Sequence, residues 1–268
     1  MITMPRAKKY PGIRVRNRRW GNRIQHLLMW KGKPAVYYRS GMWCGIYSDT
    51  FDIFVRILAK RIKNHQQNVI IANGDTGSGK STLVIKMCYE LAKRLNVTFD
   101  LQKDYIYSVD DLWVKMEDPN ASPISLIDEA ALVLNSKRSQ SNDSLDVVNL
   151  FNTMRSRGWT TFLVTPGLYQ INKDVRITHA DYVLYCSSDD DSFLPGFGRG
   201  MFEVSKAKRS RFAKKNGGEP YYVLQSTGVF TELSSKIDEI YQPIKEDAQE
   251  KLRKNMIERR KKKDEATA

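Results

Sequence analysis

Residues 68–82 read Asn-Val-Ile-Ile-Ala-Asn-Gly-Asp-Thr-Gly-Ser-Gly-Lys-Ser-Thr, an apolar run that leads directly into a glycine-rich loop. The run over 68–72 is short, largely β-branched and uncharged, which predicts a buried strand. From Leu83 onward a leucine or methionine recurs at every fourth position up to Leu95, which predicts an amphipathic helix. A strand, a glycine-rich loop and a helix in this order predict an α/β domain with a phosphate-binding loop.

The loop itself fits the pattern G-x-x-x-x-G-K-S over residues 74–81. Its glycines let the main chain curl so that N–H groups point inward at phosphate oxygens, and the following helix adds its positive N-terminal end. Lys80 is placed to meet the β- and γ-phosphates, and the Ser81 hydroxyl is placed to ligate Mg²⁺. We therefore expect ATP and Mg²⁺ as cofactors. The expected nucleotide-binding residues are Gly74, Asp75, Thr76, Gly77, Ser78, Gly79, Lys80, Ser81 and Thr82.

Strand and helix signals alternate through the middle of the chain. This alternation predicts the fold class α/β, a P-loop domain whose mostly parallel sheet carries helices on both faces. Residues 187–218 are rich in Asp, Ser, Gly and Lys, and we expect loops there around a weak strand near 201–204. Further strands are expected at 104–107, 124–127, 160–164 and 182–185, and further helices at 144–157 and from Ser108 onward.

Two adjacent acids, Asp128 and Glu129, follow the apolar run 124–127. In open α/β sheets the carboxyl ends of the strands are where ligands bind. We expect Asp128 to hold Mg²⁺ through water and Glu129 to polarise the attacking water as general base. The alternative is an acidic pair that only stabilises the N-terminus of a following helix, which does not exclude the catalytic role.

Transfer of a phosphoryl group to water also needs positive charge on the γ-phosphate. The candidates are Arg155, Arg157 and Arg176, and Thr165, which follows the strand 160–164, is a candidate sensor of the same phosphate. Two alternatives remain open. Cations near the end of a helix are favoured by the helix dipole alone, and Thr165 can be an ordinary threonine at the end of a strand.

These motifs together resemble the ATPase domain of the zonular-occludens-toxin-like proteins of filamentous phages, and related ATPases of archaeal viruses and plasmids, within the FtsK–HerA group. The resemblance covers roughly residues 50–186. It rests on Lys80 in its loop, Ile127-Asp128-Glu129-Ala130, Arg155-Ser156-Arg157, Val164-Thr165-Pro166 and Val175-Arg176, in that order.

The resemblance implies a ring-forming or otherwise multimeric ATPase that moves or packages DNA, or assists virion assembly. It also implies that Arg155, Arg157 or Arg176 reaches a neighbouring subunit as an arginine finger. The sequence departs from the family in two ways. Pro166 follows the threonine where many such motors have glutamine, so that Gln170 is the nearest glutamine, and the membrane span of the phage assembly proteins is not predicted here.

The net charge of +14 favours a polyanionic partner. Residues 1–48 contain no acid and interleave cations with rings that can stack on bases, which indicates nucleic acid, single-stranded nucleic acid included. Together with the resemblance, this gives DNA as the expected partner. The alternative is a solvated arm with a small hairpin whose aromatic residues form a core. Two further basic clusters are Lys206–Lys215, expected on a loop, and Arg259–Lys263, expected at the end of a charged helix. The interleaved rings are Tyr10, Trp20, Trp30, Tyr37, Tyr38 and Trp43.

Charge and pattern predict three parts, namely a basic extension over 1–49, a P-loop domain over 50–233 and a charged helical tail over 234–268 with a break at Pro243. The three cysteines are far apart and lack metal-ligand spacing, which predicts free thiols and indicates neither a disulfide framework nor a zinc site. Neither a signal peptide nor a run of 18 apolar residues is present, so we expect a cytoplasmic protein without a membrane span.

The function expected from these features is an ATP-hydrolysing P-loop motor that acts on DNA, in translocation or packaging, or in virion assembly for a virus or mobile element. One alternative is a small-molecule or nucleoside kinase, with residues 206–215 as an arginine-containing lid. Another is an ATP-regulated DNA-binding assembly module with slow turnover. Stimulation of hydrolysis by DNA distinguishes the first from the second, and negligible turnover favours the third.

Overall fold

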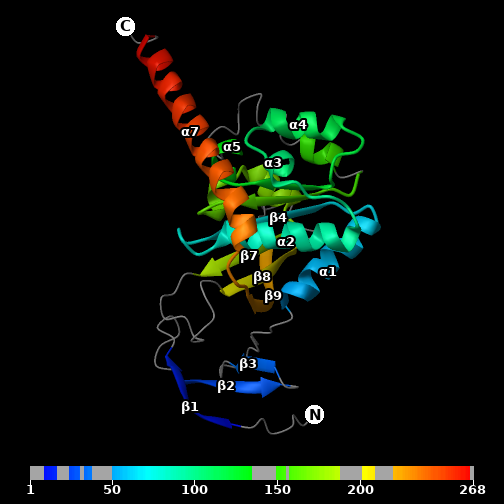
Figure 1. The fold of residues 1–268 in the computed structure, drawn as a ribbon, viewed down its shortest axis with the longest axis vertical. Coiled ribbons are helices and arrows are strands. Elements are labelled where there is room, and N and C mark those ends of the chain that lie inside the picture. The colour runs from blue at the N-terminus through cyan, green and yellow to red at the C-terminus, as the bar shows by residue number, and fades with distance from the viewer. Residues whose placement is uncertain are drawn as a thin grey trace.

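A computed structural model describes residues 9–16, 24–30, 33–37, 50–134, 149–154, 157–187, 201–208 and 220–265. Within them the main chain forms a three-stranded and a six-stranded sheet (Figure 1). The smaller sheet is antiparallel and consists of β1 (Lys9–Arg16), β2 (Ile24–Trp30) and β3 (Lys33–Tyr37). A hairpin in the basic extension is thus confirmed for the main chain, whereas the side chains of its aromatic residues lie outside the description.

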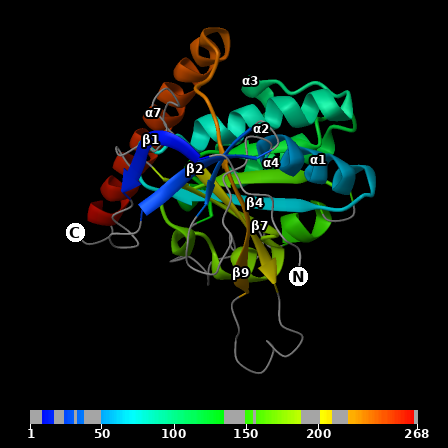
Figure 2. The same cartoon turned by 90° about the horizontal axis from the view of Figure 1, so that it is seen from below.

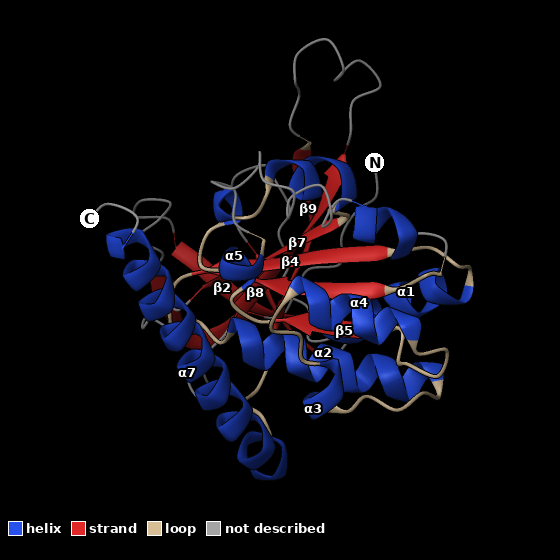
Figure 3. Cartoon of the chain, turned by 90° about the horizontal axis from the view of Figure 1, so that it is seen from above, coloured by secondary structure: helices blue, strands red, loops and turns tan. Residues whose placement is uncertain are grey.

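The larger sheet has the order β5-β6-β4-β7-β8-β9. The first four strands in this order are parallel to one another, and β8 is antiparallel to its neighbours β7 and β9. The expected α/β class with a mostly parallel sheet is therefore confirmed. Helices lie above and below the strand layer in Figure 3. The strands are β4 (Asn68–Gly74), β5 (Ile124–Ile127), β6 (Thr160–Val164), β7 (Tyr182–Ser187), β8 (Met201–Lys208) and β9 (Tyr221–Val229).

Two strand expectations need correction. Residues 201–208 form a full strand, so Lys206 and Lys208 lie on β8 and not on a loop. Phe202 and Val204 are buried and alternate with more exposed residues, which is the pattern of a strand. β8 pairs antiparallel with both β7 and β9. β9 is not among the elements expected from the sequence.

The strand expected at 104–107 is also wrong. Residues 101–104 form the short helix α3 (Leu101–Asp104), and only Tyr105 bridges to β5, at Leu126. The Asp100 carboxylate accepts from the N–H of Gln102, and Asp104 accepts from the N–H of Asp100. Both bonds pair main-chain N–H groups with nearby carboxylates, and this stabilises a helical turn in place of a strand.

The helices around the loop agree closely with the sequence. α2 spans Lys80–Leu95 as expected, and α4 (Val109–Glu117) begins after Ser108, whose hydroxyl accepts from the N–H of Asp111 at 3.1 Å. Of the helix expected at 144–157, residues 149–154 are helical and 157 is in a turn. α1 (Thr50–Lys63), which is not among the elements expected above, lies beside α2 (Figure 2).

Two hydrophobic cores cover the two faces of the six-stranded sheet. The first contains buried residues of α1, α2 and α7 packed on Ile70, Phe162 and Leu184. The second joins α4, residues 149–154 and the segment after β6 to the opposite side chains of the strands, such as Ile71 and Leu163. Alternate residues of each parallel strand thus enter different cores, which requires strands that are apolar throughout.

α7 (Ser235–Glu265) is a single helix that runs through Pro243, so the break expected there is wrong. A proline removes one helical hydrogen bond, and the carbonyl left unpaired is that of Glu239. Both residues are exposed, so water can bond this carbonyl, while buried Tyr241 and Ile244 pin the helix to the first core. The C-terminal part of α7 projects beyond the α/β body (Figure 1).

A buried ion pair between Asp104 of α3 and Lys115 of α4 links these two helices. Lys115 Nζ lies 2.7 Å from Asp104 Oδ1, and both side chains are less than 10% exposed. The ammonium group also donates to the carbonyl of Ile124 and to the Ser125 hydroxyl. Each charge is therefore compensated in the interior, where an unpaired charge is strongly unfavourable.

We predict that Lys115→Met lowers the free energy of unfolding by about 3–5 kcal/mol, because it leaves the Asp104 carboxylate buried without its cation. Urea unfolding monitored by circular dichroism measures this. Lys103→Met, on the exposed side of α3, is the matched control and should change stability by less than about 0.5 kcal/mol. Adding Asp104→Leu to Lys115→Met should restore more than half of the loss; equal stability of wild type and Lys115→Met would contradict the assignment.

Candidate nucleotide-binding site

The glycine-rich loop connects β4 to α2 and needs glycine at particular positions. Gly74, Gly77 and Gly79 have φ values of 141°, 81° and 81°, which side chains rarely adopt. A Cβ on Gly74 would lie 2.0 Å from the carbonyl oxygen of Cys186 on β7, and one on Gly79 would lie 3.0 Å from the Phe230 ring. The loop is thus pressed between β7 and the chain that follows β9.

Polar groups of the loop are directed inward. Ser78 is fully buried, and its hydroxyl has no hydrogen-bond partner among the described residues. Lys80 Nζ donates to the carbonyl of Gly74 at 3.0 Å and to that of Asp75 at 2.7 Å. A buried hydroxyl and an ammonium group that donates to loop carbonyls fit a loop that receives phosphate oxygens.

Ser81 and Asp128 meet although they lie on different elements. Ser81 is in the first turn of α2, Asp128 follows β5, and the Ser81 hydroxyl donates to Asp128 Oδ1 at 3.0 Å. A hydroxyl and a carboxylate are both oxygen ligands of the kind that Mg²⁺ prefers, with the carboxylate bound directly or through water. Both residues proposed from the sequence as metal ligands therefore fit the group, and the structure brings them together.

The second oxygen of Asp128 is bonded from the C-terminal helix. Tyr241 on α7 donates its hydroxyl to Asp128 Oδ2 at 2.8 Å, and both residues are less than 10% exposed. Sequence reasoning did not identify Tyr241, because α7 reads as a charged, solvated helix. The available signal was the helical spacing of apolar residues within that charged segment, namely Ile237, Tyr241, Ile244 and Ala248.

Glu129 is held in an unusual main-chain conformation beside Asp128. Its φ and ψ values of 55° and 43° are left-handed, and it precedes the short helix α5 (Ala130–Val133). Although the residue is exposed as a whole, partial burial of its carboxyl group, followed by repulsion from Asp128, raises its pKa. The positive charges of Lys80 and Lys245 lower this pKa, but they only partly offset the two larger effects.

Lys245 was also missed in the sequence. It lies one turn after Tyr241 on α7, with its Nζ 5.9 Å from the centre of the Tyr241 ring. Its charge lowers the pKa of Glu129, against the larger effects of burial and Asp128, so α7 contributes a cation as well as a hydroxyl here. Its neighbours in the sequence are charged, so no local pattern distinguishes it.

Thr165 is buried at the end of β6, next to β4. Its N–H donates to the carbonyl of Ala72 at 2.9 Å, and its hydroxyl donates to the carbonyl of Gly167 at 3.0 Å. The amide oxygen of Gln170, on the turn η3 (Leu168–Gln170), lies 3.4 Å from the same hydroxyl. Thr165, the candidate sensor, and Gln170, the nearest glutamine, therefore adjoin each other although Pro166 follows the threonine in the sequence.

The three candidate arginines differ in their placement. Arg157 donates to the carbonyl of Met116 at 2.5 Å. Met116 precedes β5 and Arg157 precedes β6, so Arg157 lies toward the amino ends of the strands, whereas the loop follows the carboxyl end of β4. Arg176, on η4 (Val175–His179), is buried with its guanidinium 4.5 Å from the centre of the exposed Tyr169 ring. Arg155 lies outside the described residues. Arg157 is thus remote from the loop of its own chain, and a role in a neighbouring subunit stays a prediction.

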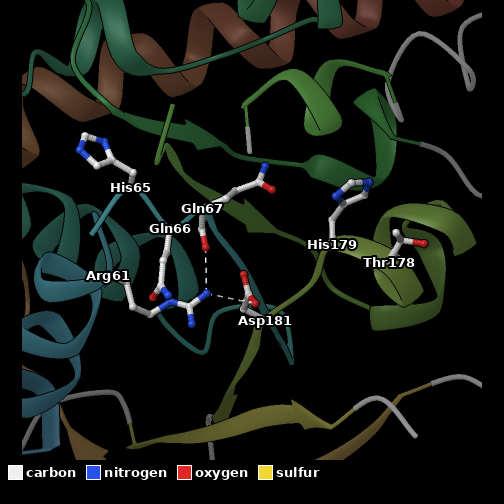
Figure 4. Close-up of a pocket in the computed structure, with 7 residues that line it drawn as sticks. All are labelled: Arg61, His65, Gln66, Gln67, Thr178, His179 and Asp181. Carbon is white, nitrogen blue, oxygen red and sulfur yellow. Dashed lines mark hydrogen bonds and ion pairs between the residues drawn. The ribbon is translucent and has the colours of Figure 1, made fainter. Parts of the chain in front are cut away.

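A polar pocket of about 430 Å³ lies at the beginning of β4 and β7, and not at the loop (Figure 4). Arg61 lines it, with its guanidinium 3.2 Å from Asp181 and donating to the carbonyl of Gln67 at 2.9 Å. Asp181 also accepts from the N–H of Val69. These groups satisfy one another and tie α1 to two strands, so we interpret the pocket as structural.

Glu129→Gly should be more stable to unfolding than Glu129→Ala by roughly 1 kcal/mol, since glycine has no Cβ to oppose the left-handed conformation. Urea unfolding of the two variants, which both lack the carboxylate, measures this difference. As a control, the same pair of substitutions at the exposed helical residue Lys93 should give the reverse order. Greater stability of Glu129→Ala would contradict the geometry described for this position.

Within the part of the chain that the structure describes, every helix is too short or too polar to cross a lipid bilayer. No curated protein shows significant similarity to the sequence. A family model described as zonular occludens toxin (Zot) matches residues 91–191. This segment begins inside α2, after the glycine-rich loop, and contains Asp128, Glu129, Thr165 and Arg176.

Similar solved structures were found as well. The N-terminal domain of zonular occludens toxin from Neisseria meningitidis is 17% identical, with a TM-score of 0.38, over 64% of this chain and 97% of that chain. The genome packaging NTPase of Sulfolobus turreted icosahedral virus 2, in complex with AMP, is 14% identical, with a TM-score of 0.38, over 52% and 92%. A KaiC-like protein from Pyrococcus horikoshii is 14% identical, with a TM-score of 0.32, over 61% and 89%.

This chain thus combines a glycine-rich loop on a mostly parallel sheet with two acids after β5. The family model matches the part that contains the acids. The expected resemblance to the zonular-occludens-toxin-like proteins is thus confirmed for residues 91–191, which include both acids after β5.

Proposed function

We propose that this protein hydrolyses ATP with Mg²⁺ at the loop 74–82 and uses the reaction to move or package DNA, or to assemble virions, for a virus or mobile element. The observation that supports this most is the hydrogen bond between Ser81 and Asp128, which prepares two oxygen ligands at the mouth of the loop. Such a pair serves hydrolysis of a nucleoside triphosphate, since the metal must lie between the phosphates and the carboxylate.

The loop residues would bind and orient the triphosphate. Its main-chain N–H groups and the start of α2 attract phosphate oxygens, and the Ser78 hydroxyl is a further donor. Lys80 would exchange the carbonyls of Gly74 and Asp75 for the β- and γ-phosphates. When bound, Mg²⁺ neutralises phosphate charge and aligns the leaving group.

Glu129 would accept the proton of the attacking water. A general base works best when its pKa lies near the working pH, and burial together with Asp128 raises the pKa of Glu129 in that direction. Lys245 in the same chain, and Arg155, Arg157 or Arg176 of a neighbouring subunit, are candidates for charge stabilisation at the γ-phosphate. An arginine acting between subunits requires an oligomer, and a ring is the arrangement that we propose.

DNA as the partner is supported by charge. The net charge is +14, residues 1–48 contain no acid, and Lys206 and Lys208 are exposed on β8. Not every cation is available. Lys251 and Lys254 on α7 pair with Asp247 and Glu250 one turn earlier, at 2.7 Å each, so this stretch of the helix is partly neutralised. We therefore expect the N-terminal extension to bind DNA more than the middle of α7.

DNA should stimulate ATP hydrolysis severalfold, and Lys80→Ala should abolish it, because the ammonium group is lost from the phosphate site. The measurement is phosphate release with and without single- and double-stranded DNA, on protein of known oligomeric mass. Lys93→Ala, at an exposed position near the other end of the same helix, is the control that should retain hydrolysis. Phosphorylation of a small-molecule acceptor without DNA stimulation would instead identify a kinase.

Glu129→Gln should lower kcat by about 10²–10⁴-fold while ATP still binds, because the base is lost and the loop is intact. In wild type, kcat should fall as the pH is lowered through the raised pKa of Glu129, since only the ionised carboxylate accepts a proton. This fall should therefore begin at higher pH than for an ordinary glutamate, and it should be absent from the residual rate of Glu129→Gln. An unchanged kcat in Glu129→Gln would exclude Glu129 as the base.

DNA binding should weaken with salt at a log–log slope near −5 for about six phosphate contacts. Fluorescence anisotropy of a labelled oligonucleotide at several salt concentrations measures this slope. Replacing six cations of residues 1–48 with glutamine should reduce its magnitude, whereas Lys251→Gln should leave it nearly unchanged. A salt-independent affinity would argue against DNA as the main partner.

A further inference from the structure

The Asp128 carboxylate is held from two directions by parts of the chain that are far apart in the sequence. Ser81 donates to one oxygen at 3.0 Å and Tyr241 donates to the other at 2.8 Å. Asp128 is only 8% exposed, so little solvent is available to replace either donor. The orientation of the carboxylate therefore depends on α7 as well as on α2.

The Tyr241 side chain is fixed around this hydrogen bond. Its ring is buried in the first core, and its hydroxyl donates to Asp128 Oδ2 at 2.8 Å. The charge of Asp128, after burial, contributes to the raised pKa of Tyr241 and of Tyr105, so the Tyr105 phenol is a second neighbour of this carboxylate.

The chain before Tyr241 is attached to the phosphate-binding helix. Lys86 on α2 donates to the carbonyls of Thr231 and Glu232 at 3.0 and 3.1 Å. The Phe230 ring lies against Gly79 in the loop itself. Residues 230–241 thus pass along the start of α2 before α7 reaches Asp128.

We propose that Tyr241 is a positioning residue that fixes the Asp128 carboxylate for the metal and links α7 to the state of the nucleotide site. With Oδ2 bonded to Tyr241, Oδ1 stays beside the Ser81 hydroxyl, where Mg²⁺ or its water would bind. Any shift of Asp128 on metal binding is then transmitted to Tyr241. This inference rests on the proposed function of the loop as a site for ATP with Mg²⁺.

Two matched variants separate this role from packing. Tyr241→Phe removes one hydroxyl and keeps the ring in the first core. Tyr107→Phe also removes one hydroxyl between the α/β body and α7, because Tyr107 donates to the carbonyl of Ile244 at 3.4 Å, but that hydroxyl does not contact Asp128. A general loosening of α7 would affect both variants, whereas loss of carboxylate positioning would affect only the first.

The first measurement is calorimetric titration with a non-hydrolysable ATP analogue, with Mg²⁺ and with EDTA. Tyr241→Phe should bind the analogue about tenfold more weakly than wild type in Mg²⁺ and equally well in EDTA. Tyr107→Phe should match wild type in both conditions. The second measurement is amide hydrogen exchange in residues 235–250, which the analogue with Mg²⁺ should slow in wild type and Tyr107→Phe but not in Tyr241→Phe.

The remaining outcomes overturn the inference. Equal affinities of wild type and Tyr241→Phe in Mg²⁺ would overturn it while leaving the proposed function intact. Tighter binding by Tyr241→Phe would show that the hydroxyl competes with the metal, and equal losses in both variants would show a packing role. Failure of the wild type to bind the analogue in either condition would overturn the proposed function and this inference with it.

Discussion

The carboxylate of Asp128 is the point at which the separate parts of this chain converge. It terminates β5, accepts from the first turn of α2 through Ser81 and accepts from α7 through Tyr241. Since a buried carboxylate is strongly unfavourable without donors, the positions of all three elements are constrained together. The loop between β4 and α2 faces the same place, which explains why the polar residues of the site gather there.

Much of this arrangement follows from local sequence. α2, β5 and β6 have the bounds expected from apolar periodicity, and the Ser108 cap begins α4 as its side-chain chemistry predicts. The pairing of Ser81 with Asp128 also follows, since both come after strands whose carboxyl ends meet at one edge of a parallel sheet. In these cases the information lies within a few residues of the feature.

What the sequence does not reveal depends on distant partners. Tyr241 and Lys245 lie in a segment whose composition is that of a solvated helix, and only its packing against the first core brings them to the site. Asp104 is another example, because two side-chain bonds to the main chain form a helical turn where its neighbours favour a strand. The proximity of Gln170 to Thr165 likewise depends on the turn after β6.

The bridge between Tyr105 and Leu126 has a consequence for the behaviour of the protein in solution. β5 is at the margin of the six-stranded sheet, and an uncovered margin of apolar residues is a template for pairing with another molecule. Residues 105 and 106 cover it, since the N–H of Ile106 donates to the carbonyl of Leu126 at 2.8 Å. The same short segment that brings a phenol to Asp128 therefore also shields this strand from self-association.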